Sequence, residues 1–474
     1  MKTYDKLYYD GQWQEAKSDD YREVINSANE EVIAKVKSAS KEDIDLAVQS
    51  AKEAFDSWSQ LDPKDRASYL EQIAQGIEDR LDEIAETVVL ELGSSRDFSQ
   101  SAQAQNAVNE MRAILKDFAD FSFVDQVDQG QVVKEGTGVV ACITPWNFPL
   151  NQIQRKITPA LLAGNTVVVK PASETPLTAY ILADIIHQVG LPKGVFNMVF
   201  GSGSSVGDYL ADHPDIALIS FTGSTEVGRL MYQKAGKGIK RLVLELGGKS
   251  AMVFLEGGDL EAAVKQAADT VLDNQGQTCS ALSRLIVPGD RLEDTKAILK
   301  DYYQDIQVGD PSQDGVKVGP MVSKDQYQRV LDYIAKGKEE GAQVLVGGQA
   351  VDGPGYFIQP TVFTEATNDM TIAREEIFGP VLTVLTYDSV EEAIAIANDS
   401  PYGLSGAVTG PKDEALEVAK RLRTGNVNVN QASRNPRLPF GGYKESGFGR
   451  ENGIYALDDY LELKAILNKS SSLI

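Results

Sequence analysis

The chain contains few of the residues on which many cysteine and metal chemistries depend. Its 474 residues include only two cysteines and two histidines. Two cysteines cannot build a disulfide framework, and no Cys/His cluster indicates zinc. Cysteine hydrolases activate the thiol with an imidazole, but His187 lies in an apolar helical stretch and His213 in a predicted turn. A Cys–His hydrolase therefore stays open only as an alternative, and a reducing, cytoplasmic location is expected.

Basic residues and long apolar runs are also scarce. The sequence has 46 Lys and Arg against 69 Asp and Glu, a net charge of −23. That charge repels phosphate backbones and anionic lipid surfaces, so no nucleic acid partner is expected. The longest uncharged run, 137–154, contains prolines and polar amides, which excludes a membrane span. The N-terminus lacks the apolar region of a signal peptide. We expect no membrane association.

The length and the order of predicted elements indicate the fold class. A chain of 474 residues exceeds one hydrophobic core, so two or three domains are expected. Short strands are predicted within 5–37, and helices over 41–58, from Pro63 to about 88, and over 96–121. From Val132 onward, strands at 138–143, 166–170, 195–200 and 217–221 alternate with helices. This pattern predicts an α/β fold with a parallel, doubly wound sheet, whose ligands bind at the carboxyl ends of strands.

Cys279 is the candidate nucleophile. It lies in the polar, glycine-containing loop 274–281, between a predicted helix over 260–271 and a predicted strand over 282–288. A rigid scaffold can present a reactive group at such a junction. Cys142, in contrast, lies inside the apolar strand 138–143 and is expected to be inert.

Glu245 is the candidate base. It is the lone carboxylate of an apolar strand over 242–248. Burial raises the pKa of a carboxyl group, which suits a general base near neutrality. A structural alternative is a carboxylate bonded to nearby backbone amides.

One glycine-containing turn fits phosphate binding better than the others. The segments 201–207 and 247–250 depart from the dinucleotide and phosphate-loop patterns. In 221–228 a strand end precedes a helix start, where Gly223 permits close backbone approach and Ser224 offers a hydroxyl. The free N–H groups beyond attract phosphate oxygens. A plain β–α turn is the alternative interpretation.

Seven motifs together resemble one family. They are Thr144-Pro-Trp-Asn-Phe-Pro149, Lys170-Pro171, Phe221-Thr-Gly-Ser-Thr225, Leu244-Glu-Leu-Gly-Gly-Lys249, Gly276-Gln-Thr-Cys279, Glu375-Glu-Ile-Phe-Gly-Pro380 and the run from Pro439 to Arg450. Their order and spacing resemble the aldehyde dehydrogenase superfamily over essentially the whole chain. The resemblance implies a Rossmann-like doubly wound NAD(P)-binding domain (1–117 and 137–246), an α/β catalytic domain (247–446) and a small β-strand oligomerisation arm (118–136 and 459–474). It also implies a homodimer or homotetramer.

The resemblance further implies a mechanism and a set of site residues. Cys279 would attack an aldehyde, and the Asn147 amide with the Cys279 N–H would hold the oxyanion. Hydride transfer to NAD or NADP would leave a thioester, hydrolysed by water that Glu245 activates, without a metal. The implied cofactor-binding residues are Thr144, Trp146, Lys170, Ser173, Gly223, Ser224, Leu246, Glu376 and Phe378. Those implied for the substrate pocket are Phe148, Arg155, Asp273, Arg434 and Phe440.

Two positions depart from the pattern of many relatives. Ser173 stands where many NAD-dependent relatives have a glutamate that would repel a 2′-phosphate, so we expect NADP+ to be accepted at least as well as NAD+. The next residue, Glu174, would oppose NADP+ binding if the loop turned its side chain inward. Arg155, in the implied aldehyde tunnel, favours a polar or carboxylate-bearing aldehyde, and Asp273 could pair with it.

Three alternatives remain open at this stage. A CoA-acylating enzyme is disfavoured by the retained Glu245. A non-phosphorylating glyceraldehyde-3-phosphate dehydrogenase is a further possible activity within the same family. A catalytically dead binding or structural protein on the same fold is disfavoured by intact Cys279, Glu245 and Asn147.

Overall fold

The computed structural model describes residues 1–128 and 130–467, and its first large sheet is mostly parallel. The strand order is β20-β12-β11-β8-β9-β10-β2-β3, formed by Gly447–Phe448, Arg241–Glu245, Ile216–Thr222, Val139–Ile143, Thr166–Lys170, Phe196–Met198, Lys6–Tyr9 and Gln12–Glu15. The five strands from β12 to β10 run parallel, with antiparallel strands at both edges. Every residue of β8 and β9 is buried, as expected where helices cover both faces. The predicted α/β fold with a parallel sheet is confirmed.

Helices surround this sheet, and two of them differ from the prediction. The helices are α1 (Lys41–Ser59), α2 (Pro63–Glu78), α3 (Leu81–Leu92), α4 (Arg96–Phe98), α5 (Asn106–Phe118), α6 (Pro149–Leu162), α7 (Leu177–Val189), α8 (Asp208–Asp212) and α9 (Thr225–Gly238). The helix predicted over 96–121 ends at Phe118 and includes a π-helical segment, Ser99–Gln105. The single helix predicted from Pro63 to about 88 is wrong, because Arg80 leaves helical geometry (φ −121, ψ 20) between α2 and α3. The apolar stripe continues across the break because Ile77 and Ile84 enter the same core.

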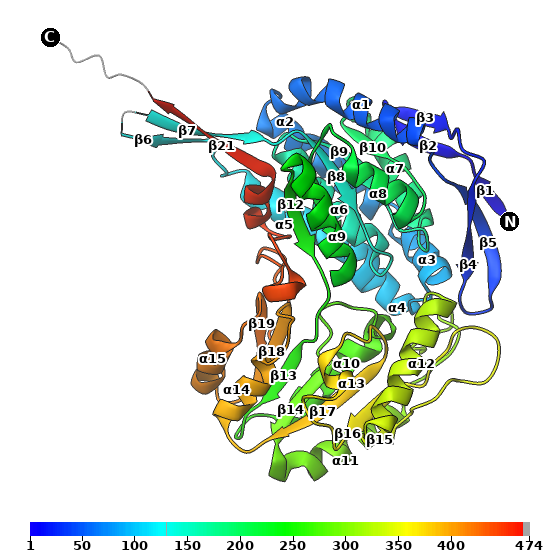
Figure 1. The fold of residues 1–474 in the computed structure, drawn as a ribbon, viewed down its shortest axis with the longest axis vertical. Helices are drawn as coiled ribbons and strands as arrows, with labels where there is room; N and C mark the ends of the chain where they lie inside the picture. The colour runs from blue at the N-terminus through cyan, green and yellow to red at the C-terminus, as the bar shows by residue number, and fades with distance from the viewer. Residues whose placement is uncertain (129, 468–474) are drawn as a thin grey trace.

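The second large sheet belongs to the later part of the chain (Figure 1). Its order is β15-β16-β17-β14-β13-β18-β19, formed by Gln343–Val346, Thr361–Thr364, Val381–Tyr387, Arg284–Pro288, Ala251–Phe254, Ser405–Thr409 and Asn426–Val429. All neighbours are parallel except β15 with β16. The helices of this part are α10 (Leu260–Leu272), α11 (Leu292–Gln304), α12 (Lys324–Glu339), α13 (Thr371–Arg374), α14 (Val390–Asn398) and α15 (Lys412–Arg421). Residues 246–250 connect β12 to β13, and β20 returns the chain to the first sheet.

Two small sheets complete the fold. Strands β6 (Val124–Val127), β7 (Gly130–Gly136) and β21 (Leu461–Leu467) form an antiparallel sheet that projects from the molecule in Figure 1. Strands β1 (Lys2–Tyr4), β4 (Tyr21–Asn26) and β5 (Glu31–Lys37) form the other. Strand β21 lies within the segment 459–474 that was predicted to belong to a β-strand arm, whereas residues 129 and 468–474 of that arm lie outside the described residues. Within the described ranges, no helix combines the length and apolar character needed to cross a bilayer.

Candidate active site

Cys279 lies in a loop whose backbone is held in an unusual conformation. After α10, a short turn over Asp273–Gly276 places Asn274 and Gln275 in the left-handed region, with φ of 53° and 58°. Gly276 follows with φ of 70°, and a Cβ there would lie 2.1 Å from the Gly379 carbonyl oxygen. The turn therefore needs glycine. It presents a half-buried Cys279 between α10 and β14, the junction predicted from the sequence.

A cavity of about 200 Å³ contains Cys279 and most of the predicted cofactor residues. Its lining includes the predicted Trp146, Asn147, Gly223, Ser224, Leu246, Glu376 and Phe378, together with Pro145, Thr222, Gly247, Gln326 and Arg329. Three of its walls are the loops that follow the carboxyl ends of β8, β11 and β12. This is where a parallel sheet binds its ligands.

Asn147 is fixed beside the cysteine loop. Its side-chain Nδ2 donates to the Gln277 carbonyl at 2.9 Å. Its own carbonyl accepts from Gln103 Nε2 and from Asn274 Nδ2, each at 2.9 Å. The side-chain amide is thereby held in one orientation against the segment that carries Cys279.

The surroundings of Cys279 favour its protonated thiol. Burial raises its pKa to about 12, the negative charges of Glu376 and Glu245 add to this, and Arg155 opposes it. A thiol is a weak nucleophile until it loses its proton, so Cys279 needs a base. Cys142 is fully buried in β8, as predicted, and burial likewise raises its pKa to about 12.

Glu245 ends β12 as a buried carboxyl group without a bonding partner. It is 3% exposed, and neither side-chain oxygen has a hydrogen-bond partner among the described residues. Burial raises its pKa well above the usual value, and the charge of Glu451 adds to that effect. The raised pKa agrees with the sequence-based prediction, whereas the alternative of a carboxylate bonded to backbone amides is wrong.

The charged neighbour of Glu245 was not predicted from the sequence. Lys156 on α6 and Glu451 form a buried ion pair with Nζ and Oε1 2.7 Å apart. Lys156 lowers the pKa of Glu245 and Glu451 raises it. The two partners are 295 positions apart, so only the fold brings them together.

Lys170 and Ser173 converge on one backbone oxygen outside the cavity. Lys170 Nζ donates to the Gly201 carbonyl at 3.1 Å and to the Pro171 carbonyl at 2.8 Å. Ser173 Oγ donates to the same Gly201 oxygen at 3.0 Å. Burial lowers the pKa of Lys170 to about 8, while Glu174 is exposed. Neither residue, nor the buried Thr144, lines the 200 Å³ cavity.

The remaining predicted cofactor residues have defined supports. Ser224 caps α9 by accepting from the Val227 N–H at 3.3 Å, so the helix N-terminus faces the cavity that Ser224 lines. Glu376 Oε1 accepts from the Gly248 N–H at 2.9 Å. Phe378, with a positive φ of 60°, packs edge-on against Trp146 with ring centroids 5.3 Å apart.

Sequence analysis missed part of the cavity lining. Gln326 and Arg329 lie one turn apart on α12, where Gln326 Nε2 donates to the Phe378 carbonyl at 2.7 Å and Arg329 to the Glu376 carbonyl at 2.9 Å. Nothing local in the sequence marks them. Gly247, in contrast, lies in the motif that begins at Leu244.

The prediction that Asp273 pairs with Arg155 is wrong. Asp273 pairs with Lys317 instead, because the turn after α10 directs it toward that lysine. Arg155 binds Glu110 of α5 in a bidentate ion pair with both side chains buried. Arg434 also reaches Glu110, with Nη2 2.8 Å from Oε1.

The other predicted pocket residues complete this cluster or lie beside it. The guanidinium carbons of Arg155 and Arg434 are 5.3 Å and 5.7 Å from the Phe440 ring centroid. Phe148 packs against Phe98 with centroids 6.1 Å apart. One carboxylate thus serves two guanidinium groups near Cys279, whose pKa Arg155 lowers. The cluster carries one uncompensated positive charge.

Neither histidine serves Cys279. His187 Nδ1 is 3.4 Å from the Tyr8 hydroxyl, and His213 Nε2 is 3.4 Å from Asp45. Neither imidazole contributes to the pKa shift of Cys279. The Cys–His hydrolase alternative is excluded.

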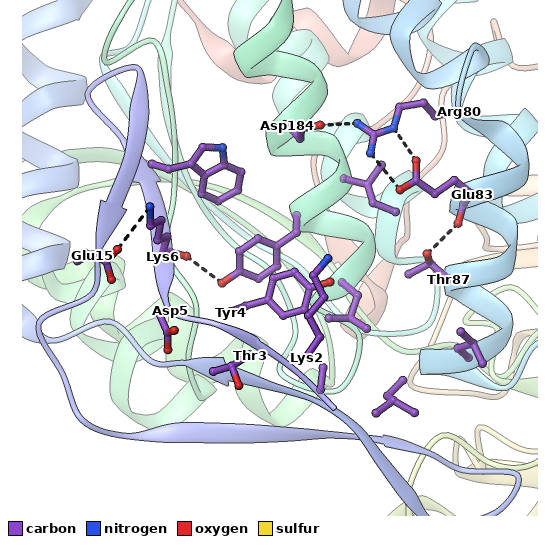
Figure 2. Close-up of a pocket in the computed structure, with 17 residues that line it drawn as sticks. Lys2, Thr3, Tyr4, Asp5, Lys6, Glu15, Arg80, Glu83, Thr87 and Asp184 are labelled. Atoms are coloured by element: carbon purple, nitrogen blue, oxygen red, sulfur yellow. Dashed lines mark hydrogen bonds and ion pairs between the residues drawn. The ribbon is translucent and has the colours of Figure 1, made fainter.

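A larger groove lies away from this chemistry (Figure 2). Its volume is about 670 Å³, and it lies between the N-terminal strands and the helices α3 and α7. Several of its charges pair with one another, as in Arg80–Asp184 at 2.7 Å and Lys6–Glu15 at 3.4 Å. It contains no cysteine, so it is not the reaction site.

Fold and site together define an α/β protein whose cavity contains a cysteine and the start of the helix that Ser224 caps. The aldehyde dehydrogenase family profile matches residues 13–466. A Staphylococcus aureus protein with a provisional aldehyde dehydrogenase name is 44% identical over 470 residues, 98% of this chain and 99% of that protein. The chain belongs to the aldehyde dehydrogenase family.

Solved structures agree with this assignment. One is a cysteine-to-alanine mutant of Pseudomonas syringae aldehyde dehydrogenase C, in complex with NAD+ and octanal. It has a TM-score of 0.97 and 42% identity, and the match covers 99% of this chain and 98% of that one. A Mycobacterium tuberculosis aldehyde dehydrogenase with NAD+ has a TM-score of 0.95 and 38% identity, and the match covers both chains completely.

Proposed function

We propose that this protein oxidises an aldehyde to the carboxylic acid with NAD(P)+ and hydrolyses a cysteine thioester on the way. The observation that carries the proposal is the convergence of Cys279, Asn147, Glu376 and Phe378 on one cavity. The structural relatives solved with NAD+, one of them also with octanal, support it.

The residues suit the dinucleotide that this reaction needs. Gly223 and Ser224 at the start of α9 offer the free N–H groups that bind a diphosphate. Glu376 and Lys170 would hold the two riboses, with Thr144, Ser173 and Leu246 alongside, and Phe378 with Trp146 would flank the nicotinamide. Arg329 adds a positive charge to the cavity wall. When bound, the nicotinamide supplies a hydride acceptor.

The protein side chains then divide the reaction between them. Glu245 accepts the thiol proton as Cys279 Sγ forms a bond to the aldehyde carbon, and the Asn147 amide with the Cys279 N–H holds the oxyanion. Glu245 then releases that proton to solvent. Each donor in such a site contributes roughly 3 kcal/mol to transition-state stabilisation. Loss of hydride leaves the thioester. Glu245 takes a proton from water as the water oxygen attacks the thioester carbon. The C–S bond then breaks, the acid leaves, and the proton on Glu245 returns to Cys279 Sγ.

We also propose that NADP+ is accepted at least as well as NAD+. Ser173 places no charge where many relatives have a glutamate, and the exposed Glu174 side chain leaves the Ser173 hydroxyl beside Lys170. Two like charges about 4 Å apart would repel by about 4 kcal/mol at an effective dielectric constant near 20. That barrier to a 2′-phosphate is missing here.

The proposed substrate is an aldehyde with a polar or carboxylate-bearing tail. Arg155 is already committed to Glu110, so the attraction comes from the uncompensated charge that Arg434 adds to the pair. Arg434 is also the more accessible of the two, with half of its side chain exposed. A CoA-acylating enzyme is disfavoured because Glu245, which would supply the base for hydrolysis, is retained. A non-phosphorylating glyceraldehyde-3-phosphate dehydrogenase is the alternative within the family.

The three-part organisation is proposed with the function. The strands β6, β7 and β21 would form the oligomerisation arm of a homodimer or homotetramer. The exposed Val127 and Leu463 on these strands support an intermolecular contact. The parts 1–117 with 137–246 and 247–446 would be the cofactor and catalytic domains.

Production of reduced nicotinamide tests the proposal. Aliphatic, aromatic, hydroxy- and carboxy-aldehydes are compared with NAD+ and NADP+ in parallel, with the Cys279→Ala variant as a blank. We expect turnover, acid as the product, and the highest kcat/KM with a polar or anionic aldehyde. If folded, thiol-reduced protein reduced neither cofactor with any aldehyde, the oxidative proposal would be wrong.

A further inference from the structure

Lys249 is a buried lysine without a bonding partner. It follows Gly248 in the connection between β12 and β13, and it is 2% exposed. Its Nζ has no hydrogen-bond partner among the described residues. A buried, unpaired ammonium group is strongly unfavourable unless it loses its proton or gains a counter-ion. An unpartnered buried polar atom in a folded protein commonly marks a water molecule or an ion.

Lys249 lines a small cavity that contains no acidic residue. The cavity has a volume of about 10 Å³, enough for about one water-sized particle. Its lining includes two cations, Lys249 and Arg284, but no aspartate or glutamate. The remaining lining residues are uncharged, and Ser250, Asn398, Tyr402, Ser405 and Thr424 are the polar ones among them.

The other cations of this region are already satisfied by backbone oxygens. Arg284 donates to the carbonyls of Lys249 at 3.0 Å, Ile396 at 3.0 Å and Ala397 at 2.9 Å. Lys444 Nζ donates to the carbonyls of Asn398 at 2.7 Å and Ser400 at 3.0 Å. Lys249 Nζ, in contrast, finds no such acceptor in the part of the chain that the structure describes.

The acidic residues nearby are engaged elsewhere. Glu376 accepts from the Gly248 N–H, and Glu375 accepts from the Tyr333 hydroxyl. Asp399 pairs with Arg374, with Nη1 and Oδ2 3.1 Å apart. These acids therefore form no direct ion pair with Lys249. The cavity lacks an acid although the chain as a whole carries a charge of −23.

We propose that Lys249 binds one monatomic anion, chloride, in the cavity it shares with Arg284. The ammonium group donates to the anion, the Arg284 guanidinium adds its field, and no covalent step is involved. Burial and the charge of Arg284 lower the pKa of the free Lys249 to about 7. Anion uptake is therefore coupled to proton uptake, and affinity falls roughly twentyfold from pH 6.5 to pH 8.5 as the protonated fraction falls.

Thermal unfolding in matched salts tests this on the full, cofactor-free chain. Midpoints are measured at one scan rate in sodium chloride, sodium bromide and sodium gluconate of equal ionic strength. At pH 6.5 we expect both halides to raise the midpoint by about 2 °C over gluconate, and the rise to shrink at pH 8.5. Lys249→Met should abolish the difference, whereas Lys300→Met, at an exposed site on α11, should keep it.

Bromide diffraction provides a second measurement that needs no variant. An anomalous peak within hydrogen-bond distance of Lys249 Nζ in a bromide-soaked crystal supports the proposal even if Lys249→Met does not fold. A water molecule at that position, or identical midpoints in halide and gluconate at pH 6.5, would overturn it. The aldehyde activity does not enter either measurement.

Discussion

Arg155 and Glu110 form a buried, bidentate ion pair in which Nε donates to Oε2 at 2.8 Å and Nη2 donates to Oε1 at 2.7 Å. Arg434 shares the same carboxylate. The pair links α6 to α5, so one acidic residue joins two helices and also contacts the arginine proposed to attract the substrate.

Removal of the Glu110 charge should strongly destabilise the protein. Glu110→Gln leaves the Arg155 guanidinium buried without a counter-charge, which costs about 3–5 kcal/mol. Urea unfolding measures the loss. Glu261→Gln is the matched control, since its pair with Lys265 is exposed and worth about 0.5 kcal/mol or less. Equal losses in the two variants would contradict a structural role for the buried pair.

The two cysteines should differ completely in function. Cys279→Ala should abolish turnover but retain cofactor binding, because Cys279 forms the bond to the substrate and does not hold the dinucleotide. Cys142→Ala should keep most of the activity, since its thiol is fully buried in β8. Steady-state rates and fluorescence titration with reduced nicotinamide check both. Activity that survives in Cys279→Ala would refute the assignment of the nucleophile.

Glu245 should control the pH profile of turnover. A base works only when deprotonated, and burial raises the pKa of Glu245, so kcat should fall as pH falls through that raised value. Glu245→Gln should lose this dependence and about 10²–10⁴-fold in kcat. A burst of reduced nicotinamide followed by slow turnover would place the defect at thioester hydrolysis. An unchanged profile in the variant would assign the base elsewhere.

A charge at position 173 should switch cofactor preference. Ser173→Glu places a carboxylate near the proposed 2′-phosphate, and about 4 kcal/mol of repulsion lowers kcat/KM for NADP+ roughly a thousandfold. The value for NAD+ should stay within a fewfold. Ser173→Ala is the control for loss of the bond to the Gly201 carbonyl. A strong preference of the wild-type enzyme for NAD+ would contradict the proposal that NADP+ is accepted at least as well.

Gly276 should tolerate no side chain. Gly276→Ala combines left-handed strain of about 1 kcal/mol with overpacking of about 2 kcal/mol, because the new Cβ would meet the Gly379 carbonyl. Gly341→Ala is the matched control, with φ of 96° and no atom within 4 Å of the added Cβ. Unfolding free energies should therefore fall by about 3 and 1 kcal/mol. Similar losses would show that the contact with Gly379 is relaxed easily.

The amino-acid sequence alone determined the local elements and the reacting groups. Periodicity predicted the strands around Val168 and the helix that begins at Leu260, because side chains on one face must enter a core. The polar setting of Cys279 and the isolated charge of Glu245 marked them as unusual. The motifs then indicated the family. Each of these signals is local, because it involves only a few neighbouring residues of the chain.

Only the tertiary structure decided which charges meet. Glu110 replaced Asp273 as the partner of Arg155, and Glu451 joined Lys156 across 295 positions. Gln326 and Arg329 entered the cavity wall from a helix that carries no motif. Pairing between residues far apart in the chain depends on how the two sheets and their helices pack. The order of side-chain types along the sequence does not reveal which of these residues come into contact. The sequence determined which reactive side chains are available. The packing of the two large sheets and their helices decided which charges surround those side chains.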